Sequence, residues 1–413
     1  MQLVAYGAQD IYLTGNPQIT FFKVVYRRHT NFSMEAIQQT WNGSSSSNGR
    51  CTSTISRNGD LVSRMYIEVE TDAGVQTDNP GCSWIKSVEL EIGGQRIDKQ
   101  SGYYLETHAE LTQKNDSGLV CVATTTQDGA GDGTIFQRMS GMGGVSDAGA
   151  TIDLLYYVPL QFWFCKNPGL ALPLIALQYH EVKVILDHSI ESTYGATPSN
   201  QLWVDYIYLD TDERRRFAQQ SHEYLIEQVQ EQSIASGATV SDLNFNHPVK
   251  ELVLTCGGAP EGAANSCSLA SPFGDITNKM TLKLNGHERF SPRVVSYFTR
   301  VQVYEHHSGC GGLNSTAGSL AVALPELDGN TLAAGAAATV SYNGPNDSIA
   351  VYSFALKPEE HQPSGTCNFS RIDNAQLVMS TGAFAGSQFT KCFAVNYNVL
   401  RIMSGMGGLA YSN

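Results

Sequence analysis

Hydrophobic and polar residues alternate with a period of two along several short segments of the chain. Residues 87–92 (SVELEI) and residues 280–284 (MTLKL) each place apolar side chains on one side and polar side chains on the other. This period is that of a β-strand with one buried face. Helical periodicity is scarce, and its clearest instance runs from Asp210 to Gln228. The pattern predicts a β-protein in which this segment forms a turn and a short helical connector.

Each of these two alternating runs ends at a dipeptide that favours a tight turn. The first run is followed by Gly93 and Gly94, and the second by Asn285 and Gly286. A type I′ turn needs positive φ at both central residues, which Gly and Asn tolerate. The sequence therefore predicts the same β-hairpin twice, 192 residues apart (286 − 94 = 192).

Further matches between the two halves of the chain support an internal repeat. Because they occur in the same order and at a similar spacing of 196 residues, they indicate tandem β-modules of about 190 residues each. We expect an arm over residues 1–25, a first module over 26–211, a connector over 212–223, a second module over 224–402 and a tail over 403–413. The pairs matched at 196 are Leu160 with Leu356, Gly169 with Gly365 and Val182 with Val378.

Composition agrees with a sheet protein that has long loops. Charged residues make up 16% of the chain, against roughly 25% in ordinary soluble domains, and there are 39 glycines. Gly-, Ser- and Ala-rich stretches lie at 43–49, 122–150, 257–275 and 308–347. Loops of this length in a compact domain usually form functional or contact surfaces.

The net charge argues against a nucleic-acid-binding role. Lys and Arg number 26 and Asp and Glu number 39, which gives −13. A protein that binds DNA neutralises phosphates with Lys and Arg, so we expect no direct nucleic-acid binding. The three consecutive arginines at 214–216 lie beside Asp210, Asp212 and Glu213, which favours local salt bridges over a phosphate site.

Cysteine usage and the absence of targeting segments predict a reducing compartment. Nine cysteines are scattered without a Cys-x-x-Cys pair, which favours free thiols. The N-terminus has no signal-peptide pattern, and the best apolar stretch, Leu170–Leu177, is eight residues long. Because a span needs about 20 residues, we expect no membrane insertion.

The sequence contains no recognisable catalytic motif. Two His-Glu pairs, at 180–181 and 222–223, are followed by Val184 and Ile226 where a zinc-protease helix needs its second His. The Gly-rich string MSGMGG occurs at 139–144 and 403–408. Neither copy lies in the strand–loop–helix order of a phosphate-binding loop, so we expect a flexible loop and a flexible tail there. We therefore predict neither an enzyme nor a cofactor. We also predict no metal, because adjacent histidines seldom bind one ion and no zinc-site spacing is present in the set His306, His307, Cys310 and His361.

Long strings along the whole chain resemble the major capsid proteins of nucleocytoplasmic large DNA viruses, most closely those of the chlorella-virus (phycodnavirus) type. The resemblance covers the strands of both halves and the connector, and leaves out mainly the long loops. It rests on several strings in order, among them Tyr12–Lys23 (YLTGNPQITFFK), Tyr26–Phe32 (YRRHTNF), Ile55–Leu61 (ISRNGDL), Val88–Lys99 (VELEIGGQRIDK) and Asn167–Val182 (NPGLALPLIALQYHEV).

The resemblance implies a fold, an assembly and a location. The family's fold is two consecutive eight-stranded jelly rolls, which agrees with the internal repeat found independently. It implies a homotrimer that forms a pseudo-hexagonal capsomer and contacts neighbouring capsomers and minor capsid proteins in an icosahedral outer shell. An internal membrane and double-stranded DNA lie beneath that shell, and synthesis takes place in the host cytoplasm.

The resemblance also bears on glycosylation. Chlorella-virus capsid proteins resemble one another in carrying glycans made by virus-directed chemistry, so the acceptor need not lie in a standard sequon. Our candidates in the longest loop are Asn314, Asn330 and Asn346.

Two alternatives to a principal capsid subunit stay open. One is a β-sandwich module that binds glycans or a receptor, for which Trp41, beside a Ser-rich loop, is the available tryptophan. The other is a less abundant capsid paralogue with a special lattice position, since segments 119–150 and 305–348 depart from the pattern expected of the commonest protein of this type.

Overall fold

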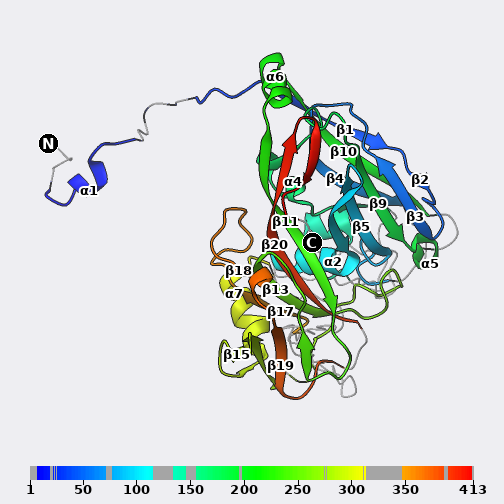
Figure 1. Cartoon of the computed structure of the whole chain (residues 1–413), viewed down its shortest axis with the longest axis vertical. Helices are drawn as coiled ribbons and strands as arrows, with labels where there is room; N and C mark the ends of the chain where they lie inside the picture. Colours follow the sequence, from blue (N-terminus) through cyan, green and yellow to red (C-terminus); the bar gives the residue numbers. More distant parts are fainter. Residues whose placement is uncertain are drawn as a thin grey trace, which may run out of the picture.

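Four antiparallel sheets build two β-sandwiches in succession along the chain (Figure 1). The computed structural model describes residues 7–18, 22, 24, 26–70, 77–114, 134–145, 155–194, 198–273, 275, 277–309, 311–312, 347–385 and 389–411.

The first sandwich pairs a sheet of order β1-β10-β4-β7 with a sheet of order β2-β3-β9-β5-β6. The short strand β8 adds to the edge of β4. The strands are β1 (Phe32–Gln39), β2 (Asn42–Gly43), β3 (Gly49–Thr54), β4 (Leu61–Glu70), β5 (Ile85–Ile92), β6 (Gln95–Ser101), β7 (Leu155–Pro159), β8 (Leu172–Pro173), β9 (Val182–His188) and β10 (Ser199–Leu209).

The second sandwich pairs a sheet of order β11-β20-β13-β17 with a sheet of order β12-β19-β14-β15. Short strands β16, β18 and β21 pair with β14, β13 and β20. The strands are β11 (His222–Ser233), β12 (Val240–Asp242), β13 (Pro248–Cys256), β14 (Lys279–Leu284), β15 (His287–Glu288), β16 (Arg293–Val294), β17 (Ile349–Ser353), β18 (Cys367–Asn368), β19 (Ala375–Thr381), β20 (Thr390–Met403) and β21 (Met406–Leu409).

The two sandwiches have the same topology. The main strands of the first, taken in chain order from one to eight, are β1, β3, β4, β5, β6, β7, β9 and β10, and its sheets run 1-8-3-6 and 2-7-4-5. The corresponding strands β11, β12, β13, β14, β15, β17, β19 and β20 give the same two orders. This is the double-sheet jelly roll. The prediction of two tandem eight-stranded jelly rolls is confirmed.

Helices are short and lie between the strands. The longest described one, α2, follows β6 and is buried along almost its whole length, so its sequence shows no amphipathic period that would have predicted it. The helices are α1 (Ile11–Thr14), α2 (Gly102–Thr112), α3 (Ile135–Ser140), α4 (Trp163–Lys166), α5 (Ile190–Tyr194), α6 (Thr211–Gln219) and α7 (Gln302–His306), with short turns η1 (Pro168–Leu170), η2 (Tyr297–Val301) and η3 (Phe369–Arg371).

The helical connector is shorter than the sequence predicts. Asp210 caps α6 by accepting a hydrogen bond from the backbone N–H of Thr211 at 2.8 Å, and the helix ends at Gln219. From His222 the chain is strand β11, which pairs with β20 over its full length. The expectation of a helical segment up to Gln228 was wrong because pairing with β20 overrides the weak helical preference of these residues.

Both predicted turns lie between antiparallel strands. Gly93 and Gly94 join β5 to β6 with φ of 59° and 86°, and Asn285 and Gly286 join β14 to β15 with φ of 52° and 78°. Positive φ at both central residues is what a type I′ turn requires.

Strand register shows which of the repeat's matches are structurally equivalent. Ile92, the last residue before the first turn, lies opposite Val182, whereas Leu284, its counterpart before the second turn, lies opposite Ala375. The two jelly rolls therefore correspond here at a spacing of 193 (375 − 182 = 193). The match of Val182 with Val378 at a spacing of 196 was wrong, because the turn and the strand pairing set which residues are equivalent, and identical residue types do not.

The two MSGMGG strings are ordered, so the expectation of a flexible loop and tail was wrong. In the first, the N–H groups of Gly143 and Gly144 donate to the buried carboxylate of Glu106 at 2.9–3.1 Å. In the second, strand β21 pairs back onto β20, and the carbonyl of Gly405 accepts a hydrogen bond from Tyr179 N–H at 3.0 Å. Glycine lets the backbone approach these partners closely, and the contacts then hold it in place.

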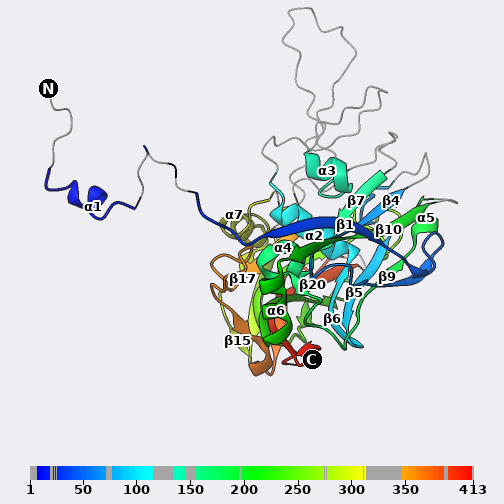
Figure 2. The same cartoon turned by 90° about the horizontal axis from the view of Figure 1, so that it is seen from above.

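The hydrophobic core of the first jelly roll continues into the second. One cluster of buried side chains includes Val88 and Leu90 of β5 together with Val253 of β13 and Phe393 of β20. A separate cluster fills the second sandwich, with Leu252, Leu282 and Ala394 among its members. Since β13 and β20 bury both of their faces, the two jelly rolls form one packed unit (Figure 2).

Candidate functional site

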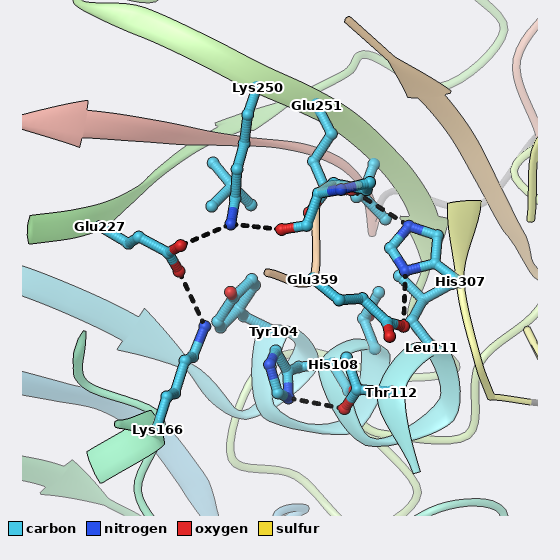
Figure 3. Close-up of a pocket in the computed structure, with 14 residues that line it drawn as sticks. Tyr104, His108, Leu111, Thr112, Lys166, Glu227, Lys250, Glu251, His307 and Glu359 are labelled. Carbon is cyan, nitrogen blue, oxygen red and sulfur yellow. Dashed lines mark hydrogen bonds and ion pairs between the residues drawn. The ribbon is translucent and has the colours of Figure 1, made fainter. Parts of the chain in front are cut away.

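Six charged side chains, four of them buried and two about a quarter exposed, cluster where α2 and α4 of the first jelly roll meet β11 and β13 of the second (Figure 3). They line a cavity of about 50 Å³ together with apolar side chains such as Leu111 and Val253. The charged members, referred to below as the interface cluster, are Lys166 on α4, Glu227 on β11, Lys250 and Glu251 on β13, His307 after α7 and Glu359 after β17.

Glu227 links a lysine of each jelly roll. Its Oε1 lies 2.7 Å from Lys250 Nζ, and its Oε2 lies 3.5 Å from Lys166 Nζ. Burial disfavours the carboxylate, but Lys166, His361 and Lys250 outweigh burial and hold the pKa of Glu227 well below its usual range. Lys250 also donates to the Pro358 carbonyl at 2.5 Å. The carboxylate therefore stays ionised between two ammonium groups.

His307 stands between two carboxylates. Its Nε2 lies 3.1 Å from Glu251 Oε2, as an ion pair without hydrogen-bond alignment, and its Nδ1 lies 3.2 Å from Glu359 Oε1. Burial disfavours the imidazolium, but Glu251 and then Glu359 outweigh burial and raise the pKa of His307 to about 9. His307 is therefore a cation at neutral pH.

The interface cluster is electrically balanced. Lys166, Lys250 and His307 supply three positive charges, which match the three negative charges of the cluster's glutamates. Removing one of its buried members leaves an uncompensated buried charge, which is far more costly than breaking a surface pair. Of these pairs, Lys166–Glu227 joins the first jelly roll to the second, and the other pairs lie within the second.

Further contacts of the two jelly rolls surround the interface cluster. Tyr104 of α2 packs edge-on against Phe393 of β20, with ring centroids 5.6 Å apart. Asp98 of β6 accepts a hydrogen bond from Val229 N–H of β11 at 3.1 Å, and burial raises the pKa of Asp98 to about 6. Asn79 Nδ2 donates to the Cys267 carbonyl at 2.8 Å. The interface therefore extends beyond the cluster to contacts of α2, β6 and the segment before β5.

Sequence reasoning missed most of the interface cluster, because its members are spread from residue 166 to residue 359. One local signal existed: Lys250 and Glu251 interrupt a strand that is otherwise apolar, PVKELVLTC. Of the set considered for a metal, His307 and His361 do face the cluster, whereas His306 lies against the Leu356 carbonyl at 3.2 Å. In the described part of the chain, no group of three His, Cys, Asp or Glu side chains is arranged to hold a metal ion.

The remaining sequence-predicted residues lie apart from this interface cluster or outside the described residues. Gly93 lies against the His180 ring, and Gly94 and Gly286 are open to solvent, with no atom within 4 Å of an added Cβ. Asn314, Asn330 and Asn346 lie outside the described residues. All seven described cysteines are free thiols, and within the described ranges no helix is long and apolar enough to cross a bilayer.

Two protein families match the chain, and together they cover both jelly rolls. The family described as "Major capsid protein N-terminus" matches residues 20–210. The family described as "Large eukaryotic DNA virus major capsid protein" matches residues 213–312 and 335–408. The division between the two matches falls at the start of α6.

Individual relatives match over the full chain. The major capsid protein of Pyramimonas orientalis virus is 49% identical, covering 100% of this chain and 99% of the relative. The major capsid protein of Paramecium bursaria Chlorella virus 1 is 40% identical with the same coverage. A chain of the quasi-atomic model of the PBCV-1 virus capsid superposes with a TM-score of 0.70 at 36% identity, covering 95% of this chain and 100% of that chain. The chain therefore belongs to the major capsid proteins of large eukaryotic DNA viruses.

Proposed function

We propose that three copies of the chain form a pseudo-hexagonal capsomer that tiles the icosahedral outer shell of a large double-stranded DNA virus. The observation that carries the proposal is the packed boundary between two jelly rolls of equal topology. Three rigid pairs supply six similar units, which is what a hexagonal outline needs. Closed rings of this kind arise when one surface of a subunit binds a different surface of the next.

The sheets have two distinct ends, which supports a fixed polarity in the shell. At one end, Glu70 lies opposite Ser199 in the first jelly roll, and Thr255 lies opposite Ile349 in the second. The described residues that flank the longest loop are close to this end. A Cβ added to Gly312 would contact Ile349, and Asp347 precedes Ile349 by two residues in the sequence. We infer that this loop end faces outward. Any glycan on Asn314, Asn330 or Asn346 belongs to the same face.

The opposite end carries the N-terminal arm. Phe32 lies opposite Leu209, and Figure 1 shows the arm leaving the body beside α6. Its described apolar side chains Ile11, Leu13 and Phe22 are exposed. We infer that the arm faces inward and binds a neighbouring capsomer or a minor capsid protein, above the internal membrane and without contacting DNA.

The alternative of a glycan-binding module receives little support. Trp41, the tryptophan that the sequence left available for a sugar, is partly buried and packs against the core. In the interface cluster each charged group has a partner of opposite sign. The proposal is thus of a structural, non-catalytic subunit.

Light scattering after size-exclusion chromatography tests the assembly. A capsomer of three copies gives three times the chain mass of 44.8 kDa. A stable monomer would contradict the capsomer and favour a separate surface module. Limited proteolysis of intact particles tests the polarity: cuts within 306–347 should precede cuts within residues 1–23, and the reverse order would invert the assignment.

A further inference from the structure

Two cysteines from different jelly rolls meet at the boundary between them. Cys82 lies in the connection between β4 and β5, and Cys267 lies in the topologically equivalent connection between β13 and β14. Both side chains are fully buried. Burial, and next a side-chain hydrogen bond with Cys267, raise the pKa of the Cys82 thiol well above its usual range. The two sulfur atoms are therefore close neighbours, although both thiols are free.

Hydrogen bonds join the two connections beside these thiols. Asn79 Nδ2 donates to the Cys267 carbonyl at 2.8 Å, and Ser266 Oγ donates to the Ser83 carbonyl at 2.8 Å. Each cysteine therefore has an immediate or near neighbour in sequence that is bonded across the boundary. These bonds hold the backbone on both sides, so the contact between the two thiols does not depend on the side chains alone.

Helix α2 leaves room for Cys267 and places a carboxylate beside Cys82. A Cβ at Gly102, the first residue of α2, would lie 3.4 Å from Cys267 Sγ and 2.6 Å from the Cys82 carbonyl. About one turn further, Glu106 Oε2 accepts a hydrogen bond from the Cys82 thiol at 3.6 Å. Burial raises the pKa of Glu106 to about 7. A carboxylate with a pKa in this range can take up a thiol proton near neutral pH.

We propose that Cys82 and Cys267 form a disulfide that joins the two jelly rolls covalently when the protein meets a small-molecule disulfide such as oxidised glutathione. The inference concerns a single chain and does not depend on the proposed capsomer. A hydrogen bond between two thiols brings their sulfur atoms close, which is the first requirement for a disulfide. Cytosolic thiols stay reduced, whereas disulfides form and persist in oxidising surroundings such as the surface of a released virion.

The reaction balances as two successive thiol–disulfide exchanges. The thiolate of Cys267 attacks one sulfur of the oxidant, which breaks the oxidant's S–S bond and releases one small thiol. Cys82 gives its proton to Glu106 and attacks the Cys267 sulfur of the mixed disulfide, which releases the second small thiol. In sum the two cysteines lose two electrons and two protons, and the oxidant gains both.

The crosslink has two consequences for the chain. It ties together residues that are 185 positions apart (267 − 82 = 185), which restricts the unfolded chain and so raises stability. It also prevents the two jelly rolls from separating without reduction of a covalent bond. Because both thiols are buried, one of the two connections must open before the first exchange, so we expect oxidation of the native protein to take minutes to hours.

The test treats the purified, reduced chain with oxidised glutathione, both in the native state and during refolding from urea. Refolding exposes every thiol to the oxidant, so burial cannot hide a pair that is able to bond. The samples are then denatured, alkylated and digested without reduction, and mass spectrometry identifies linked peptides. We expect the peptide that contains Cys82 to be linked to the peptide that contains Cys267, and the link to disappear on reduction.

Variants separate this specific crosslink from general oxidation. The oxidised wild type should melt about 5 °C above the reduced form, as expected for a long closed loop in a chain of this size. Cys82→Ser and Cys267→Ser should each abolish both the link and this difference. The control Cys367→Ser should keep both, because Cys367 on β18 lies opposite Val249 at the other end of β13. Comparing oxidised with reduced protein within each variant removes the effect of serine on the fold.

The expected link together with the rise in melting temperature confirms the inference. If both thiols are still alkylated after refolding with the oxidant, the pair is only two small apolar residues of the core, and the inference is overturned. It is overturned equally if the link joins other cysteines, or if the linked protein melts no higher than the reduced one. Neither measurement depends on assembly, so a monomeric wild type would contradict the capsomer and leave this inference intact.

Discussion

Two equivalent sheets of the molecule have outward faces of different character. In the second jelly roll, β13 is buried on both sides, and Lys250 and Glu251 are enclosed with it. In the first, β4 alternates between buried residues and the partly exposed Tyr66 and Glu68. The topology is the same, so the difference comes from what covers each face. The covered face needs internally balanced charges, whereas the uncovered face keeps polar and aromatic groups that tolerate water.

The largest expected effect concerns a charge on the covered face. Lys250→Met leaves the buried carboxylate of Glu227 without its closest partner, so we expect a loss of about 3–5 kcal/mol in the free energy of unfolding. Urea denaturation followed by fluorescence measures it. The control is Lys283→Met, which removes an ion pair at a partly exposed site and should cost less than about 1 kcal/mol. Equal losses would show that the two kinds of site do not differ.

A pH titration of stability tests the role of His307, which pairs with Glu251 of the covered face. A pKa raised from 6.5 to about 9 contributes stability that is complete below pH 6.5 and is lost as pH rises through 9. The contribution is roughly 3 kcal/mol at most, and His307→Gln should flatten the fall in melting temperature between pH 7 and 10. The exposed control His287→Gln should keep the wild-type profile. If the His307→Gln variant lost stability between pH 7 and 10 as steeply as wild type, the assignment of this pH dependence to His307 would be contradicted.

Replacement of one residue by threonine on each face compares the two faces. Val253→Thr places a hydroxyl on the covered face and should cost about 2 kcal/mol, because a buried hydroxyl without a partner is unfavourable. Tyr66→Thr on the uncovered face should cost the single chain less than about 1 kcal/mol. Both are measured by denaturation below the concentration at which capsomers form. A larger loss at Tyr66 would mean that the first face is also covered within the chain.

The two hairpin turns belong to neither face, and the same substitution should destabilise both to a similar extent. At Gly94 and Gly286 an added Cβ meets no atom within 4 Å, so Gly→Val at either costs only the positive φ, about 1–2 kcal/mol. Thermal unfolding of both variants measures it. If both variants melted at the wild-type temperature, the type I′ turns would not be a source of specificity for this fold. A large effect at one position alone would mean that the two turns are not equivalent.

Local features of the fold were readable from the sequence. Positive φ at Gly93 and Asn285 follows from the residue types themselves, because few other residues adopt it at low cost. Alternation over residues 87–92 placed Val88 and Leu90 correctly in the core. Resemblance to a capsid family then supplied the number of strands, which periodicity alone left undetermined.

Only the tertiary structure decided the features that depend on distant partners. Helix α2 is buried almost all around, so its sequence lacks the polar face that marks a surface helix. Residues 222–228 became strand because β20 lies beside them. The interface cluster joins Lys166 to Glu227 and His307 to Glu359, and nothing local to any of these residues indicates its partner. The sequence by itself determined backbone preferences and the burial pattern along single strands. Which charges meet was decided by packing, because the energy of a buried ion pair depends on a distance that only the folded chain defines.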